Sequence, residues 1–365
     1  MQKHLEENRS IVLAEIRVVV TGANGFIGRR LVEALVGAKA QVTVLLRTSH
    51  GKRFFEALGL TVVICKLTEN AELENALQGN EVVFHFAYDV RAEGAANFAA
   101  FSALYKTAKR AGIRRFIHAS SIVVYDDWPA GRITENGPVT SPESGDYRST
   151  KIAMENVLLE GEMPAAILQP TLVYGPDSAL WTNAPCVALR RGPVVLPDPV
   201  GKCALVFVED VVSAALRAAA LPNLKQERFI ITGPETPTWN EFFEGYINLI
   251  KTGSVKHKPV EELKARLPVP DVKAARSKPS APARVSALLR HMIGSRRFDQ
   301  IMSHIRARRT GEGPVYPNRN MLELYSATPI ISCDYAHERL GYDPQYDLEA
   351  GFAELVNSGK MDMKN

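Results

Sequence analysis

The stretch VVVTGANGFIGRR (18–30) joins a run of valines to a turn that carries glycines at positions 22, 25 and 28. Uninterrupted β-branched residues are typical of a parallel strand that is covered on both faces. The sequence LVEALVGAKA follows, and it places Leu31, Leu35 and Val36 on one side of a helix. A glycine-rich turn between strand and helix lets a pyrophosphate approach the backbone, where free N–H groups bind its charge. The spacing alone is a weak signal, because glycine turns end many strands.

Segments typical of strands and helices alternate through the first half of the chain. This alternation indicates βαβ units and a parallel sheet. We therefore expect an α/β fold, a Rossmann-type doubly wound parallel sheet, over residues 1–175, to which the strands and helix of 203–233 return. Residues 176–365 are expected to form a smaller, mostly helical substrate-binding region. The other expected strands are 41–47, 60–67, 81–87, 114–121 and 164–175, and the expected helices include 51–59, 70–79, 97–112 and 147–159.

Composition narrows the class of protein. The 365 residues, 46% of them hydrophobic, are enough for one large domain or two. Four cysteines lie scattered without the spacing of a metal site, which is typical of a reducing compartment, and we expect no metal. A net charge of +4 is too small to indicate nucleic acid as a partner. No apolar stretch could span a bilayer and the N-terminus is too polar for a secretory signal, so a cytoplasmic protein is expected.

The segment 251–319 differs in composition, being rich in Lys, Arg, Pro and Ser with few acids. Within it, residues 285–305 place apolar side chains at helical spacing. The simpler interpretation is a pair of amphipathic helices that cap the domain. The alternative is a cationic helix that makes weak contact with a membrane surface through 284–309, or that lines an apolar substrate entrance.

Two further pieces carry the chemistry. Ser120 and Ser121 end the expected strand 114–121, and ligands of open parallel sheets bind at such carboxyl ends. Tyr147 and Lys151 lie four residues apart, on one face of a helix. A tyrosine with a pKa of about 10 is a poor base at neutral pH, but a nearby ammonium favours the phenolate. The Tyr/Lys spacing alone is more often a surface pair; combined with a nucleotide turn and a serine at a strand end, it predicts an acid–base site.

With these residues the chain resembles the extended short-chain dehydrogenase/reductase family, which includes the NAD-dependent epimerase/dehydratases. The resemblance runs from about Arg17 to Gly233 and continues more weakly to the C-terminus. Its motifs here are TGANGFIG, VVFHFA, AGIRRFIHASS, the Tyr147/Lys151 pair, LQPTLVYGP and FVEDVV, with ERLGYDPQYDLEAGF near the end.

The resemblance implies roles for single residues. Ser121 would be the catalytic serine and Tyr147 the acid/base, while Lys151 would bind the nicotinamide ribose and tune Tyr147. Family members commonly form dimers through two helices, so a homodimer is expected. The predicted cofactor-binding residues, besides Tyr147 and Lys151, are Gly22, Asn24, Gly25, Phe26, Ile27, Gly28, Arg47, Lys66, Leu67, Phe86, Ala87, Tyr88, Ser120, Pro170, Leu172 and Val173.

Two departures from the family pattern concern the cofactor. Arg47 ends the second strand, where members that prefer NAD commonly carry an acidic residue, and Lys52 and Arg53 lie close behind. An arginine there suits a 2′-phosphate, so the sequence favours NADP, with NAD as the alternative. The simpler interpretation of these residues is a solvated basic turn. The pair Lys66-Leu67 stands where many members carry Asp-Leu to meet adenine.

The reaction is predicted from what the chain carries and lacks. Sugar-nucleotide epimerases of the family often carry an arginine just before the strand of FVEDVV, where this chain has Cys203, Ala204 and Leu205. Dehydratases commonly place Asp-Glu beside the catalytic hydroxyl, whereas Ser121 is followed by Ile-Val. We therefore expect an NAD(P)-dependent oxidoreductase that transfers hydride to or from a carbonyl or secondary alcohol of a small substrate, similar to dihydroflavonol reductases and 3β-hydroxysteroid dehydrogenases. The alternatives are a 4-epimerase (or dehydratase) with tightly bound NAD and, less favoured, a non-catalytic nucleotide sensor.

Other polar residues have simpler explanations. His85, inside an expected strand, is interpreted as a core histidine. Asn97 would either anchor the backbone of the site or cap its helix. Glu209 and Asp210 are expected to start a helix, where negative charge is stabilised, rather than to bind a metal.

Overall fold

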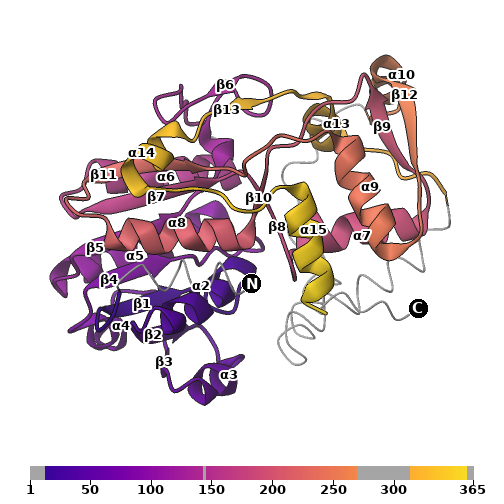
Figure 1. Ribbon diagram of the computed structural model, residues 1–365. Helices are drawn as coiled ribbons and strands as arrows, with labels where there is room; N and C mark the ends of the chain where they lie inside the picture. The colour runs from indigo at the N-terminus through magenta and orange to yellow at the C-terminus, as the bar shows by residue number, and fades with distance from the viewer. Residues whose placement is uncertain (1–12, 143–144, 269–312, 360–365) are drawn as a thin grey trace, which may run out of the picture. The chain divides into compact units, whose positions relative to one another are not determined.

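The computed structural model describes residues 13–142, 145–268 and 313–359 (Figure 1). The chain divides into two compact units. The first, the sheet unit, comprises Met1–Thr182, Lys202–Pro237 and Thr328–Asn365, and the second comprises Asn183–Gly201 and Thr238–Ala327. The C-terminal segment thus belongs with the sheet, although the sequence analysis grouped it with the substrate-binding region.

A parallel sheet of seven strands organises the described part of the sheet unit, in the order β11-β7-β5-β4-β1-β2-β3. The chain moves outward from β1 in one direction and then from β4 in the other, so the strand order reverses between these two neighbours. Such a reversal is where doubly wound sheets bind ligands. The predicted Rossmann-type fold is confirmed. The strands are β1 (Arg17–Thr21), β2 (Gln41–Leu46), β3 (Thr61–Ile64), β4 (Val82–His85), β5 (Arg115–Ala119), β7 (Ala165–Pro170) and β11 (Gln226–Ile231).

Helices cover both faces of the sheet, which explains the unbroken valine run in β1. Val18 and Val20 pack into one core cluster with residues of α2, α8 and α14, while Val19 packs into the opposite cluster with residues of α4, α5 and α6. Every side chain of this run is therefore buried. The helices of this unit are α2 (Phe26–Gly37), α3 (Lys52–Ala57), α4 (Ala71–Leu77), α5 (Gly94–Arg110), α6 (Tyr147–Leu159), α8 (Val208–Ala220), α14 (Asp334–Leu340) and α15 (Leu348–Asn357).

The single strand predicted over 164–175 is corrected to two strands. β7 ends at Pro170, and β8 (Leu172–Tyr174) leaves the main sheet to pair in parallel with β10 (Leu205–Phe207). Between them, the N–H of Thr171 donates to the carbonyl of Ile231 at 3.0 Å. The chain therefore switches partners here without a turn signal. A second small pair joins β6 (Arg132–Ile133) to β13 (Ile330–Ile331).

The second unit is built on a parallel pair, β9 (Val194–Asp198) with β12 (Val255–Pro259). Its described helices are α7 (Ala184–Arg191), α9 (Trp239–Ile250), α10 (Val260–Ala265) and α13 (Arg319–Ser326). The apolar positions of 285–305 and the proposed membrane contact of 284–309 lie outside the described residues. None of the helices described is both long and apolar enough to cross a membrane.

Candidate active site

The glycine turn after β1 is shaped by two close approaches. Gly22 has a φ of +75°, and a Cβ at this position would lie 2.4 Å from the carbonyl carbon of Phe86. Any side chain at Gly22 would therefore collide with the backbone that follows β4. A Cβ at Gly28 would lie 2.2 Å from the carbonyl oxygen of Gly22, so α2 packs directly onto the turn. A Cβ at Gly25 would meet no more than that same oxygen, at 3.0 Å.

The N-terminus of α2 is suited to bind an anion. Gly25 is the N-cap residue and has no side chain to cap the helix, and the first turn contains no acidic residue. The first N–H groups of a helix have no intrahelical partner and carry partial positive charge. Phe26 and Ile27 follow, each half-buried. A glycine cradle beside an uncapped helix start fits the pyrophosphate of a dinucleotide.

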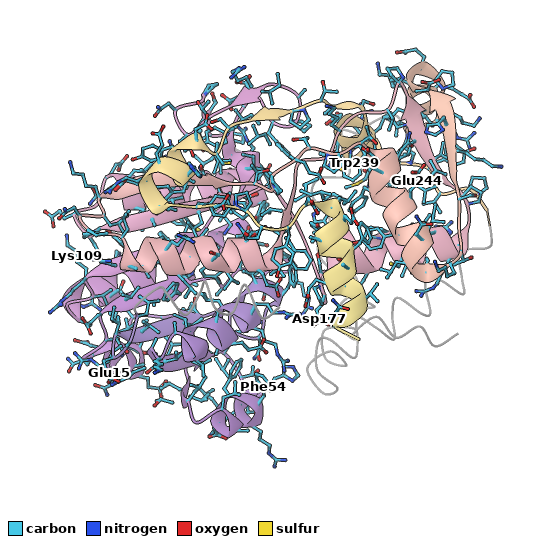
Figure 2. All side chains as sticks on the ribbon, in the orientation of Figure 1. Glu15, Phe54, Lys109, Asp177, Trp239 and Glu244 are labelled. Atoms are coloured by element: carbon cyan, nitrogen blue, oxygen red, sulfur yellow. The ribbon has the colours of Figure 1, made fainter. Side chains whose placement is uncertain are left out.

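The turn after β2 is tied to the glycine turn. The side-chain amide of Asn24 donates to the carbonyl of His50 at 2.7 Å. The guanidinium of Arg29 on α2 lies 3.8 Å from the ring centroid of Phe54 on α3, which is labelled in Figure 2. These contacts fix the basic turn of 47–53 next to the start of α2.

Arg47 is held by an acidic residue of the loop after β4. Its Nη1 lies 2.6 Å from Oδ2 of Asp89, and its side chain is 68% exposed. Burial raises the pKa of Asp89, but hydrogen bonds from Arg47 and from the N–H of Arg91 outweigh it and lower the pKa overall. Farther along the sheet edge, beyond β3, Lys66 is exposed and Leu67 half-buried.

Asn97 anchors the loop that carries Asp89. Its Oδ1 accepts from the N–H of Asp89 at 2.8 Å, and its Nδ2 donates to the carbonyl of Asp89 at 2.9 Å. The N-cap residue of α5 is Glu93, so Asn97 is not the cap. Asn97 therefore anchors the backbone of this loop, which is the first of the two predicted roles, and does not cap the helix.

The structure brings Ser121, Tyr147 and Lys151 together. Ser121 follows β5, and α6 begins at Tyr147, with the bounds the sequence predicted. The ammonium of Lys151 donates to the carbonyl of Ala119, at the end of β5, at 2.6 Å. The side chain of Ser121 lies near enough to the Tyr147 hydroxyl to lower its pKa by hydrogen bonding. Lys151 is 3% exposed, so its amine is enclosed, whereas the Tyr147 residue as a whole is 41% exposed although its hydroxyl is the desolvated part.

Tyr88 completes this group. Its ring meets the ring of Tyr147 edge to face, with centroids 4.9 Å apart and an interplanar angle of 81°. Nζ of Lys151 lies 4.9 Å from the Tyr88 centroid and 5.7 Å from the Tyr147 centroid. Tyr88 is preceded by Phe86 and Ala87, whose backbone touches Gly22. The glycine turn and the acid–base group are therefore joined through one loop.

Burial sets the protonation of the two central groups. It raises the pKa of Tyr147 to about 12, although the hydrogen bond with Ser121 lowers it in part. It lowers the pKa of Lys151 to about 7, against the opposing charge of Glu155. At neutral pH the phenol thus holds its proton and can act as an acid, while burial makes the Lys151 ammonium easier to deprotonate than a free lysine.

A buried network below Lys151 was missed by the sequence analysis. Glu155 is fully buried one turn farther along α6, and it accepts from the hydroxyl of Ser120 and from Gln169 Nε2 at 3.0 Å. Arg228 on β11 pairs with it at 2.8 Å. The hydroxyl of Ser120, predicted to bind cofactor, is thus engaged by Glu155. The four-residue spacing from Lys151 was the only sequence signal for Glu155.

His85 lies in the core, as interpreted. Its Nδ1 lies 3.0 Å from Nδ1 of His118, and the two rings stack with centroids 5.1 Å apart. Burial, with a smaller contribution from Lys151, lowers the pKa of His85 to about 3 and that of His118 well below its usual range. Both rings are neutral, with one nitrogen donating and the other accepting.

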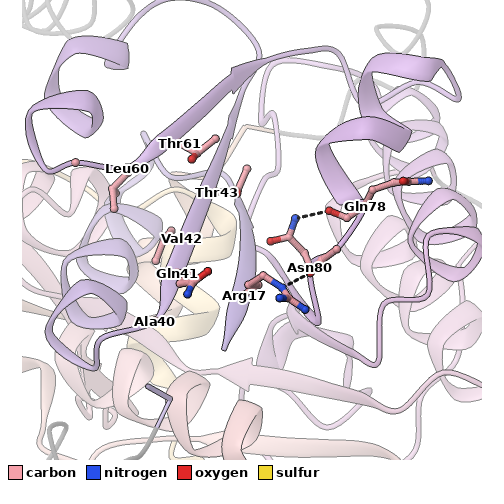
Figure 3. Close-up of a pocket in the computed structure, with 11 residues that line it drawn as sticks. Arg17, Ala40, Gln41, Val42, Thr43, Leu60, Thr61, Gln78 and Asn80 are labelled. Atoms are coloured by element: carbon pink, nitrogen blue, oxygen red, sulfur yellow. Dashed lines mark hydrogen bonds between the residues drawn. The ribbon is translucent and has the colours of Figure 1, made fainter. Parts of the chain in front are cut away.

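The remaining predicted residues lie at the same carboxyl edge. Pro170 ends β7, and Leu172 and Val173 belong to β8. A hollow of about 580 Å³ lies instead at the amino ends of β1, β2 and β3, as Figure 3 shows. None of the predicted site residues lines it. Its lining consists of Arg17, 40–43, 59–61 and 78–80.

Comparison with known proteins identifies the family of the chain. The model of the NAD dependent epimerase/dehydratase family matches residues 18–231, which include the glycine turn, Ser121, Tyr147 and Lys151. The chain belongs to this family. The resemblance to the extended short-chain dehydrogenase/reductase family is thereby confirmed. Separately, Glu209 and Asp210 lie in the first turn of α8, as predicted.

Two curated relatives differ in their reactions. The chain is 28% identical over 185 residues to the 4-hydroxy-2-methyl-3-oxo-4-farnesyl-3,4-dihydroquinoline-1-oxide ketoreductase of Stigmatella aurantiaca, covering 48% of this chain and 55% of that protein. The match thus spans about half of that relative. It is 30% identical over 255 residues to the UDP-glucose 4-epimerase of Mycolicibacterium smegmatis, covering 61% of this chain and 79% of the epimerase.

Solved structures share the fold. The dTDP-glucose 4,6-dehydratase of Bacillus anthracis str. Ames, solved in complex with NAD, superposes with a TM-score of 0.66 at 16% identity. The superposition covers 95% of this chain and 97% of the dehydratase. At 16% sequence identity, this similarity is evidence for a shared fold only.

Proposed function

We propose that the protein is an NAD(P)-dependent oxidoreductase that interconverts a carbonyl and a secondary alcohol. The observation that carries this proposal is the group formed by Ser121, Tyr147 and Lys151 at the end of β5. The glycine turn, which is joined to that group through the loop after β4, supports a dinucleotide cofactor. The membership of the family and its reductase and epimerase relatives support an enzyme.

Each residue has a defined task in the proposed reaction. A dinucleotide held at the glycine turn of Gly22, Gly25 and Gly28 would supply the hydride chemistry. Tyr147 gives its proton to the substrate oxygen during reduction and takes it back during oxidation. Ser121 holds that oxygen by a hydrogen bond, and Lys151 in its ammonium form stabilises the phenolate that remains on Tyr147. The raised pKa of Tyr147 means that the free enzyme holds the proton that reduction consumes.

NADP is the proposed cofactor. The exposed guanidinium of Arg47 offers a planar pair of donors for a 2′-phosphate, and no acidic residue ends β2. The guanidinium of Arg47 already donates a hydrogen bond to the carboxylate of Asp89, so a phosphate would have to compete with this carboxylate. NAD is the alternative, because a ribose hydroxyl needs an acceptor such as Asp89.

The substrate is proposed to be apolar. The ketoreductase relative is named for a farnesyl-bearing quinoline. A ketone on an apolar scaffold agrees with the name of that relative.

A 4-epimerase is the second candidate, because the epimerase relative is matched over more of its length than the ketoreductase. An epimerase would oxidise and re-reduce one centre with the same tyrosine. The two candidates predict different cofactor behaviour, since an epimerase retains its NAD while a reductase exchanges its cofactor.

The first experiment checks purified protein for nucleotide carried through purification and then titrates it with NADPH, NADH, NADP and NAD. Nicotinamide fluorescence reports binding. We expect an empty protein that binds NADPH most tightly. Protein that arrives loaded with NAD would overturn the reductase and favour the epimerase.

The second experiment screens apolar ketones with NADPH and compares the wild type with Tyr147→Phe. We expect the variant to bind NADPH normally and to lose about 10²- to 10⁴-fold in rate, the usual contribution of a general acid. Equal turnover by both proteins would remove Tyr147 from the mechanism.

A further inference from the structure

Tyr88 is held in place on both sides. On one side, the backbone of Phe86 and Ala87 lies against Gly22, too close to admit a side chain there. On the other, the N–H and carbonyl of Asp89 are both bound by Asn97. The Tyr88 ring is therefore presented to α6 by a loop whose backbone is held on both sides.

The position of this ring matters because Lys151 is enclosed. A buried amine loses its proton readily unless nearby groups favour the charged form. The carbonyl of Ala119 accepts one hydrogen bond, at 2.6 Å. The face of Tyr88, with its centroid 4.9 Å from Nζ, supplies the negative potential of an aromatic ring.

The other ionisable groups around Lys151 are either paired elsewhere or uncharged. Glu155, on the same helix, opposes the loss of the proton but is itself paired with Arg228 on β11. His85 on β4 and His118 on β5 are neutral. Tyr147 holds its proton at neutral pH.

We propose that Tyr88 is a positioning residue: its ring face keeps Lys151 in the ammonium form, and its edge-to-face contact orients the ring of Tyr147. The inference rests on the proposed function for its consequence in catalysis. The proposed effect of Tyr88 on the protonation of Lys151 does not depend on which reaction the protein catalyses.

The sign of the effect follows from the contact. Removal of the ring takes away a partner that favours the charged amine, so the pKa of Lys151 falls further. Lys151 then deprotonates at lower pH, and the alkaline limb of the kcat/KM profile moves to lower pH. Phenylalanine keeps the ring face and should keep the titration.

The test uses the full-length protein labelled with ¹³C at the lysine ε-carbon. The pH titration of the Lys151 signal, assigned with Lys151→Arg, is compared in the wild type, Tyr88→Phe and Tyr88→Leu. We expect the midpoint in Tyr88→Leu to lie lower by about half a pH unit or more, the shift that a desolvated cation–π contact produces. Tyr88→Phe should titrate as the wild type.

An unchanged midpoint in Tyr88→Leu would overturn the inference. So would an equal fall in both variants, which would assign the effect to the hydroxyl. Circular dichroism checks that each variant is folded, and Tyr88→Met replaces Tyr88→Leu if the latter is not. If the wild type reduces no ketone but the midpoints move as expected, the proposed function fails while the role of Tyr88 in charging Lys151 stands.

Discussion

Arg47 and Asp89, which lie 42 positions apart in the sequence, meet at the carboxyl edge of the sheet with 2.6 Å between Nη1 and Oδ2. The arginine comes from the end of β2 and the aspartate from the loop after β4. A residue chosen from the sequence as a phosphate ligand therefore already has an anionic partner. The strength of that partner decides how well a 2′-phosphate is bound.

Replacement of the arginine tests the cofactor proposal. In Arg47→Ala we expect NADPH affinity to fall about tenfold or more, because a charged hydrogen bond is lost, while NADH affinity stays the same. Fluorescence titration measures both constants. Lys52→Ala removes a neighbouring positive charge, which pairs with Glu56 at 3.4 Å, and serves as the matched control. Equal loss of NADPH and NADH binding would mean that Arg47 does not read the 2′ position.

Neutralising the partner should act in the opposite direction. Asp89→Asn keeps a side chain of similar shape and leaves the backbone contacts with Asn97 in place, but it removes the charge that holds Arg47. We expect NADPH affinity to rise about two- to fivefold, the range of an exposed ion pair. The same titration at low salt measures it. A fall in NADPH affinity would show instead that Asp89 itself contributes to the site.

The glycine turn makes a steric prediction. Gly22→Val places a branched side chain where even a Cβ would lie 2.4 Å from the backbone of Phe86, at a φ of +75°. We expect nucleotide binding to be abolished. Gly37→Ala, on the same strand–helix unit with open space around it, should bind as the wild type. Micromolar affinity in the valine variant would contradict the assignment of the turn to pyrophosphate.

The buried carboxylate of Glu155 is expected to matter for stability. Glu155→Gln leaves Arg228 without its charge partner, and we expect a loss of about 3 kcal/mol in the free energy of unfolding. Urea unfolding followed by circular dichroism measures it. Glu160→Gln, an exposed position at the end of the same helix, should change the free energy by less than about 0.5 kcal/mol. Comparable losses in the two variants would argue against a specific role of the buried network.

The sequence predicted those features that depend on local pattern. The valine run, the glycine turn and the helix from Tyr147 to Leu159 each have a periodicity or a composition that neighbouring residues determine. Parallel pairing then follows from the alternation of strands and helices, since each crossover returns the chain to the same edge.

Contacts between distant segments were not predictable in this way. The hydroxyl of Ser120 binds Glu155, and nothing near Ser120 in the sequence signals it. The break at Thr171 also depends on a distant partner, because β8 leaves the sheet to pair with β10. Contacts between residues that are far apart in the sequence can be identified only when the positions of both segments in the fold are known.

The loop 86–91 has a consequence for engineering. Asp89 reaches Arg47 with its side chain, and the adjoining Tyr88 touches Tyr147 and Lys151. Asp89, which pairs with the proposed phosphate ligand Arg47, is thus the next residue after Tyr88, which contacts the proposed proton donor Tyr147. Variants selected for a switch between NADP and NAD should therefore also show altered pH optima, and the two traits should be screened together rather than in succession.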